Sequence, residues 1–272
     1  MKSFTVEKNQ KLTKYLLDKY GAELSFSTLQ KLLRNKDIKV NGKRINKDLD
    51  VVFGDKIDVY YDGAEAKLDL VYENGDIFVF NKPQTITSED FEILVNKTYN
   101  GLKLCHRLDR NTQGLLIFSK ESSLEEMLNA FKNKTIKKYY ITEVYGKLKE
   151  PEGTLTAYLK KDSDNSLVKI FNAQVPGSVK IITKYKVLEE RENSSLIEVN
   201  LITGKTHQIR AHFSHIGHFV IGDNKYGDTK INKLFGAKRQ RLVSYKIIFS
   251  FDSGSKLYYL NNEQVELKNI KF

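Results

Sequence analysis

The stretch 106-HRLDRNTQGLLIFSK-120 combines charged side chains with a short apolar run. In it, Asp109 lies between Arg107 and Arg110, and we expect its carboxylate to be ionised because nearby cations favour the charged form. The following Thr-Gln-Gly is typical of a turn, and residues 115–118 predict a buried strand. A strand packed in the core would hold these charged side chains rigidly.

The residues alone leave two interpretations of Asp109 open. An ionised carboxylate held against a core strand suits a nucleophile or an ion-pair anchor, and it suits a general acid poorly. The same charges also fit a surface ion-pair cluster, because structural ion pairs gather acids and bases as active sites do.

The composition indicates a globular protein that binds a polyanion. The chain has 272 residues, 40% of them apolar and 29% charged, which allows a large domain with a small companion. The net charge of +11 favours nucleic acid as the partner. The sequence contains no apolar run long enough to span a membrane and no signal-peptide core in its first residues, so we expect a cytoplasmic protein that binds no membrane.

Residues 1–61 predict a small domain of two helices and a hairpin. The helices are expected at 13–19 and 27–34, followed by a hairpin over 38–45 around an Asn-Gly turn and an alternating strand at 56–61. The polar, aperiodic residues 62–69 predict a linker, and residues 70–272 then form the larger domain.

A group of basic residues gathers on the second helix and the hairpin of this small domain. Together they could form one basic face that follows a phosphate backbone, or they could form only a solvated surface. The group consists of Lys31, Arg34, Lys36, Lys39, Lys43 and Arg44.

Further elements are expected in the larger domain. Residues 77–80 predict a strand and 121–132 a helix whose inner stripe is Leu124, Met127, Leu128 and Phe131. Residues 179–188 and 195–201 predict a hairpin of half-buried strands, and 247–251 and 257–260 predict closing strands.

Three motifs closely resemble those of the RluA-like family of RNA pseudouridine synthases. HRLDR resembles the motif that carries the family's catalytic aspartate, here Asp109. The segment 138-KYYITEVYG-146 resembles a K-x-Y motif that places the family's tyrosine at Tyr140, with Tyr139 as the alternative. The segment 203-TGKTHQIRAH-212 resembles the motif that supplies an arginine, here Arg210. A strand running into Asn-Lys-Pro is similar to the first family motif, although the residues after Pro83 depart from it.

The resemblance implies an α+β fold with a mixed, mostly antiparallel central sheet and flanking helices. The two helices and basic hairpin of the small domain resemble the RNA-binding domain named after ribosomal small-subunit protein S-four, which commonly precedes this family. The resemblance covers roughly residues 11–60 and 70–250.

The implied activity converts uridine in RNA to its carbon-linked isomer. The nucleotide is turned out of its stack, the bond from C1′ to N1 breaks, and the base reattaches through C5. No group is oxidised or carried, so we expect no cofactor. The implied substrate is ribosomal large-subunit RNA, with transfer RNA as the alternative, and a monomer would suffice.

The resemblance also implies residue roles. Asp109 acts as the nucleophile or as the carboxylate that drives bond cleavage. Arg210 holds it through a forked contact, and Tyr140 stacks on the uracil and could take the C5 proton. Arg107 would fill the space that the flipped base leaves. The other residues expected along the RNA path are His106, Arg110, Lys82, Lys205, His207 and Gln208.

Two other classes of function and a metal site are alternatives. A catalytically idle RNA-binding or ribosome-assembly factor would form no pseudouridine, and a hydrolase of N-glycosidic bonds would release free uracil. His212, His215 and His218 recur at every third residue, but no cysteine or glutamate lies among them and the family motif accounts for them. We therefore expect no metal.

Overall fold

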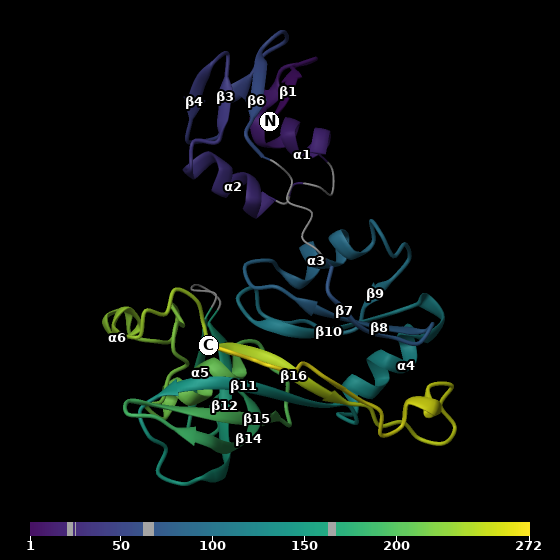
Figure 1. The fold of residues 1–272 in the computed structure, drawn as a ribbon, viewed down its shortest axis with the longest axis vertical. Helices are drawn as coiled ribbons and strands as arrows, with labels where there is room; N and C mark the ends of the chain where they lie inside the picture. Colours follow the sequence, from purple (N-terminus) through teal and green to yellow (C-terminus); the bar gives the residue numbers. More distant parts are fainter. Residues whose placement is uncertain (21–23, 25, 62–67, 163–166) are drawn as a thin grey trace. The chain divides into compact units, whose positions relative to one another are not determined.

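The computed structural model divides into two compact units, which Figure 1 shows. It describes residues 1–20, 24, 26–61, 68–162 and 167–272. One unit comprises Met1–Lys67 with Ile93–Thr98, and the other comprises Leu68–Glu92 with Tyr99–Phe272. Residues 62–67 of the predicted linker lie outside the described residues.

The smaller unit contains both predicted helices and the predicted hairpin. The helices are α1 (Leu12–Tyr20) and α2 (Phe26–Arg34). A sheet of order β1-β6-β3-β4 is formed by β1 (Lys2–Thr5), β3 (Ile38–Val40), β4 (Lys43–Ile45) and β6 (Lys56–Val59), and β2 (Gln10–Lys11) pairs with β5 (Asp50–Val51). Asn41 and Gly42 have φ values of 48° and 78°, the positive values that a two-residue hairpin turn requires. Strand β1 was not predicted.

The larger unit is built on one long mixed sheet. Its strands are β7 (Leu70–Glu73), β8 (Ile77–Lys82), β9 (Lys103–Leu104), β10 (Gln113–Ser119), β11 (Lys137–Tyr145), β12 (Glu152–Asp162), β13 (Leu167–Phe171), β14 (Val179–Glu190), β15 (Ser194–Leu201), β16 (Leu242–Ile248) and β17 (Gln264–Glu266). The main path runs β13-β12-β14-β15-β11-β16-β10-β8-β7. Only β10 and β16 pair in parallel among the described strands. The predicted α+β fold is therefore confirmed.

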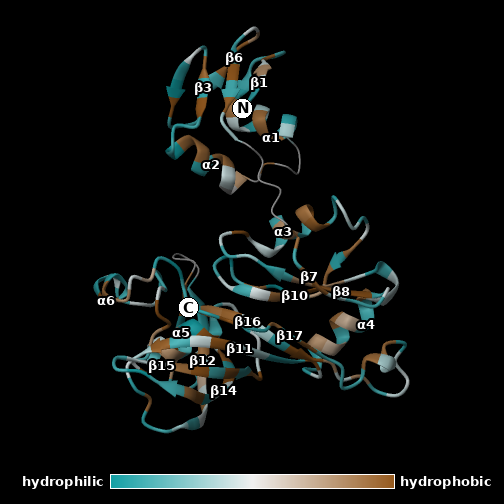
Figure 2. Ribbon diagram, viewed as in Figure 1, coloured by the Kyte–Doolittle hydropathy of each residue, from teal (hydrophilic) through white to brown (hydrophobic). Residues whose placement is uncertain are grey.

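The sequences of the central strands are continuously apolar, because helices cover both faces of the sheet there. Ile77 and Val79 of β8 belong to the cluster that contains Met127 of α4 (Glu121–Lys132). Phe80 packs edge-on against Phe91 of α3 (Ser88–Val95) on the opposite face. Figure 2 shows apolar residues gathered in β8, β16 and β17, with hydrophilic residues in the loops.

Two predicted details of this domain were wrong. Leu128 of α4 is 46% exposed, because the buried stripe of the helix is narrower and consists of Ser123, Met127 and Ala130. Residues 257–260 do not form a strand, since Tyr258–Leu260 is a short 3₁₀ helix, η2. Leu257 and Leu260 are both buried, and a spacing of three matches a 3₁₀ turn better than a strand.

The remaining helices lie in the second half of the chain. They are α5 (Gln208–His215), which packs on β12, β13 and β14, and the short α6 (Thr229–Leu234). Among the described residues, no helix is both long and apolar enough to cross a membrane.

Gly114 permits the close approach of β10 and β16 that joins the two halves of the sheet. Its φ is +120°, and a Cβ placed there would overlap the backbone of Ser244. We therefore expect Gly114→Ala to lower the free energy of unfolding by at least about 2 kcal/mol, through strain and overpacking. The control is Gly101→Ala, which has a φ of +84° with open space around it and should cost only about 1 kcal/mol. Equal losses in chemical denaturation would contradict the importance of this contact.

Candidate active site

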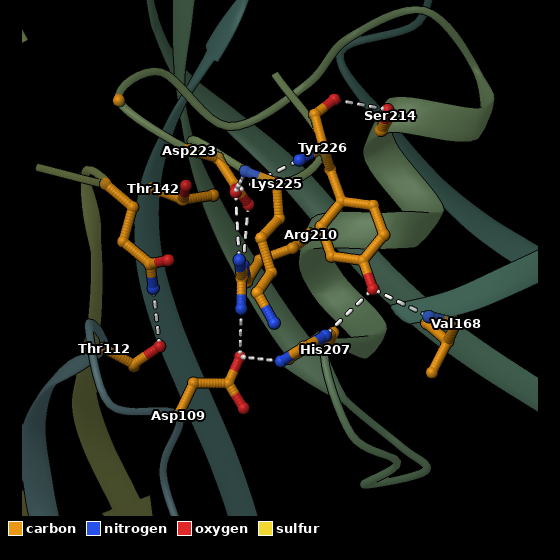
Figure 3. Close-up of polar contacts among 12 residues, drawn as sticks. Asp109, Thr112, Thr142, Val168, His207, Arg210, Ser214, Asp223, Lys225 and Tyr226 are labelled. Atoms are coloured by element: carbon orange, nitrogen blue, oxygen red, sulfur yellow. Dashed lines mark hydrogen bonds and ion pairs between the residues drawn. The ribbon is translucent and has the colours of Figure 1, made fainter. Parts of the chain in front are cut away.

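Asp109, Tyr140 and Arg210 come from three elements that meet where β10, β11 and β16 lie side by side. Asp109 lies in the loop before β10, and the Thr112 amide donates to the Asp109 carbonyl in a tight turn that fixes this loop. Tyr140 lies on β11, and Arg210 lies in the first turn of α5. Figure 3 shows Asp109 and Arg210 facing each other.

Arg210 bridges two carboxylates. Its Nη1 donates to Oδ2 of Asp109 at 2.8 Å, while its Nε and Nη2 donate to the two oxygens of Asp223 at 2.6 and 2.9 Å (Figure 3). The predicted pair of Asp109 and Arg210 is therefore present. The forked contact, however, is made with Asp223, and Asp109 receives a single hydrogen bond.

The opposite charges of Arg210 and Asp223 hold both of these groups in their ionised forms despite burial. Burial lowers the pKa of Arg210, but the two carboxylates outweigh burial and raise it above its usual value. Burial alone would raise the pKa of Asp223. The hydrogen bonds from Arg210 outweigh burial, so the pKa of Asp223 is lowered. Asp223 is 0% exposed, whereas the Asp109 side chain is 22% exposed. Asp223 can therefore only anchor Arg210, while Asp109 remains accessible to a substrate.

His207 is directed at Asp109 by Tyr226. The Tyr226 hydroxyl accepts from the Val168 amide and lies 2.8 Å from Nδ1 of His207. Nε2 of His207 lies 3.9 Å from Oδ2 of Asp109 (Figure 3). Burial lowers the pKa of His207, which favours its neutral form.

The two arginines beside Asp109 in the sequence point elsewhere. Nη1 of Arg107 pairs with Glu89 at 3.1 Å on the surface, and Nε of Arg110 donates to the Thr85 carbonyl at 3.0 Å. The cation that contacts Asp109 is Arg210, from far along the chain. Both neighbouring arginines are exposed, as a contact with RNA requires.

Tyr140 is buried on β11, near enough to Asp109 to be affected by its charge. Burial raises the pKa of Tyr140, and the negative charge of Asp109 raises it further. The hydroxyl is therefore protonated at neutral pH. A protonated phenol can stack and donate a hydrogen bond, but it is a poor acceptor for the C5 proton.

Three residues predicted to contact RNA are already bonded inside the domain. The Lys82 ammonium donates to the carbonyls of Pro83, Ile86 and Arg110, and its side chain is fully buried. The Gln208 amide contacts Ile182, Thr183, Thr203 and Lys205. Nε2 of His106 accepts from the Ile117 amide, and its ring packs on Phe131. These three side chains support the loops of the site, whereas Lys205 is exposed.

The three regularly spaced histidines bond to three different parts of the protein. Nδ1 of His212 lies 3.0 Å from the Thr183 hydroxyl, Nε2 of His215 lies 2.7 Å from Asn172, and Nδ1 of His218 lies 2.9 Å from the Tyr145 carbonyl. These contacts account for the histidines separately.

The basic residues of the smaller unit do not all lie on one side of its sheet. Lys39 and Arg44 are cross-strand neighbours, and both lie about 5 Å from the ring of Tyr60. Ile38 alternates with Lys39 and packs in the core with Leu29 and Leu33 of α2. Lys31 and Arg34 of α2 therefore lie on the other side of β3, which divides the predicted basic face.

Sequence reasoning missed two residues of the site, Asp223 and Tyr226. Both lie in the Gly-Asp and Tyr-Gly pairs that follow the Arg210 motif, so the motif could have indicated them. The sequence does not show, however, that they pair with Arg210 and His207.

Known proteins of one family resemble this chain. A family model described as RNA pseudouridylate synthase matches residues 76–215. "Uncharacterized RNA pseudouridine synthase MG209" of Mycoplasma genitalium is 33% identical over 229 residues, which cover 75% of this chain and 74% of that protein. "Ribosomal large subunit pseudouridine synthase C" of Rickettsia bellii is 32% identical over 254 residues, which cover 81% of this chain and 84% of that protein.

A solved structure shares the fold. "Human RNA Pseudouridylate Synthase Domain Containing 1" superposes with a TM-score of 0.65 at 24% identity, covering 78% of this chain and 86% of that chain. The match to the family model and the similarity to these relatives show that the chain belongs to the RNA pseudouridine synthase family of isomerases. The family expected from the sequence motifs is thereby confirmed.

Proposed function

We propose that this synthase modifies uridines of ribosomal large-subunit RNA, with Asp109 as its catalytic carboxylate. The observation that carries the catalytic role is the bridge of Asp109, Arg210 and Asp223, which presents one accessible carboxylate on a buried, fully charged support. The RNA class is supported by the relatives named ribosomal large subunit pseudouridine synthase C.

The reaction follows from this arrangement. A uridine leaves its stack, which costs least in loops and bulges, and presents its sugar and base to Asp109. Asp109 drives cleavage of the bond from C1′ to N1. The uracil turns and joins C1′ through C5, which gives its proton up to water, while N1 takes one proton up from water. Arg210 holds Asp109 in place throughout, because Asp223 fixes two of the Arg210 nitrogens.

His207 and Tyr140 assist Asp109 in the reaction, and neither is a proton donor or acceptor for the uracil in this proposal. His207 lies beside the same carboxylate oxygen that Arg210 contacts, with its Nε2 3.9 Å from that oxygen. Tyr140, which stays protonated, stacks on the uracil. Three exposed cations hold phosphates of the RNA, and each lies close in sequence to Asp109 or His207. They are Arg107, Arg110 and Lys205.

The substrate is tested by mapping pseudouridines in cells that lack the protein. Loss of pseudouridine from large-subunit RNA, restored by the wild-type gene and not by Asp109→Asn, is the expected result. Loss confined to transfer RNA would refute the proposed substrate and leave the catalytic proposal standing. No loss in any RNA would favour an idle binding factor.

The smaller unit serves as an RNA-binding domain of the S-four type in this proposal. Lys39 and Arg44 share an exposed face with Tyr60, and such a face suits a phosphate backbone with aromatic stacking. We expect Lys39→Ala with Arg44→Ala to weaken RNA binding and to reduce the slope of log K against log salt by about 1 to 2. The control is Lys31→Ala with Arg34→Ala, on the other side of β3. An unchanged slope in the first double variant would exclude its face as the docking surface.

A further inference from the structure

Lys138 lies among the segments that build the active site, but it has no part in the bridge described above. It precedes Tyr140 by two residues on β11, so both side chains point to the same face, about 7 Å apart along the strand. Its Nζ lies 3.1 Å from the position that a Cβ would take on Gly204, in the loop that leads to His207. Its charge also acts on His106, at the start of the Asp109 loop.

The ammonium group of Lys138 makes no hydrogen bond and no ion pair with the described part of the chain. The centre of the Phe131 ring lies 5.2 Å from its Nζ. The side chain is half-buried, and burial lowers its pKa. A partly desolvated cation without an anion is costly, and one aromatic ring offsets only a small part of that cost.

The surroundings of Lys138 keep its charge available to a ligand. Gly204 has no side chain, and any Cβ there would crowd the ammonium. Asp109 is held by Arg210, and His106 remains neutral because burial, together with the Lys138 charge, lowers its pKa to about 3. No carboxylate of the described residues pairs with Lys138, so an anionic ligand can supply the charge that would compensate it.

We propose that Lys138 binds a backbone phosphate of the RNA next to the everted uridine and thereby positions that nucleotide over Tyr140. A phosphate is the anion that an RNA substrate brings to this face. An ammonium that has lost part of its water interacts more strongly with a full negative charge than with a neutral uracil oxygen. The proposal uses the synthase activity of the family and does not depend on which RNA is modified.

The first test compares Lys138→Met with Lys137→Met. Methionine has a similar length without the charge, and Lys137 is the exposed neighbour on the opposite face of the same strand. We expect Lys138→Met to lower kcat/KM for pseudouridine formation about 10- to 100-fold, and Lys137→Met to change it less than about 3-fold. The Tm of Lys138→Met should equal or exceed that of the wild type, because no protein partner is left unpaired. A lower Tm would show that Lys138 serves the fold, which would overturn the proposal.

The second test identifies the phosphate. Short RNAs that carry the modified uridine are made with one neutral methylphosphonate at each phosphate around it in turn. In the wild type, one replacement should raise KM about 10-fold or more, and in Lys138→Met the same replacement should have no further effect. Lys138→Arg should keep the sensitivity of the wild type to that replacement. Equal sensitivity of the wild type and Lys138→Met at every phosphate would refute the assignment and would leave a uracil oxygen as the ligand.

Discussion

Replacing Asp109 with asparagine is expected to abolish pseudouridine formation while RNA binding remains nearly intact. Asparagine keeps the shape of the side chain but removes the negative charge and the nucleophilic oxygen, so the rate should fall by about 10⁴-fold or more. Binding should change little, because the phosphate contacts that dominate RNA affinity come from other residues. The rate is measured by chemical trapping of pseudouridine in a transcribed RNA, and the affinity by titration at fixed salt.

The control for this variant is Asp90→Asn, which removes one negative charge from the surface helix α3. It should retain wild-type activity. An Asp109→Asn protein that forms pseudouridine at more than about a hundredth of the wild-type rate would refute the role of the carboxylate. An inactive protein that has also lost its RNA affinity would indicate a role in binding.

Replacing Asp223 with asparagine should damage both the fold and the activity, although this residue is sealed from the substrate. The variant removes the charge of one of the two carboxylates that contact the buried Arg210 guanidinium, and it leaves at most one oxygen at position 223 to accept from it. Breaking a buried ion pair by removing one partner costs about 3 to 5 kcal/mol, because an uncompensated charge remains. A freed Arg210 would also misplace Asp109, so we expect kcat to fall about 100-fold.

Thermal unfolding and initial rates measure these two effects. Asp228→Asn is the matched control, since Asp228 caps α6 at the surface and asparagine caps a helix almost as well. A stable, fully active Asp223→Asn protein would show that Arg210 does not need its second carboxylate.

The pH dependence of stability provides a further check on Asp223. The Arg210 contacts lower its pKa in the folded protein below the ordinary value of 3.8. A lowered pKa adds stability at pH values above the unfolded pKa, and this contribution is lost as the pH falls through the folded pKa. The stability difference between the wild type and Asp223→Asn should therefore be constant near neutral pH and shrink below about pH 4.

Local patterns in the sequence predicted much of the fold. The Asn-Gly turn between basic strands predicts a tight hairpin, and the helix at 121–132 has the bounds that its spacing indicates. The apolar strand after Asp109 is buried on both faces, as its continuous run suggests. Each of these features depends on residues that are close in sequence.

The sequence could not show which partners the charged side chains choose. Arg107 and Arg110 are nearest to Asp109 along the chain, yet both bond elsewhere, because successive residues of the loop point in different directions. An arginine has five N–H donors, and only the folded chain shows that two of those of Arg210 contact Asp223. Lys138 illustrates the converse, since only the fold shows that it pairs with no carboxylate of the described residues.

The most direct test of the central claim follows the hydrogen on C5 of the target uridine. RNA labelled with tritium at C5 of its uridines is incubated with the wild type and with Asp109→Asn, and both released tritium and free uracil are measured. The account predicts that the wild type releases one tritium for each pseudouridine formed and no uracil, and that Asp109→Asn releases neither. Tritium released by Asp109→Asn, or uracil released by the wild type, would contradict it.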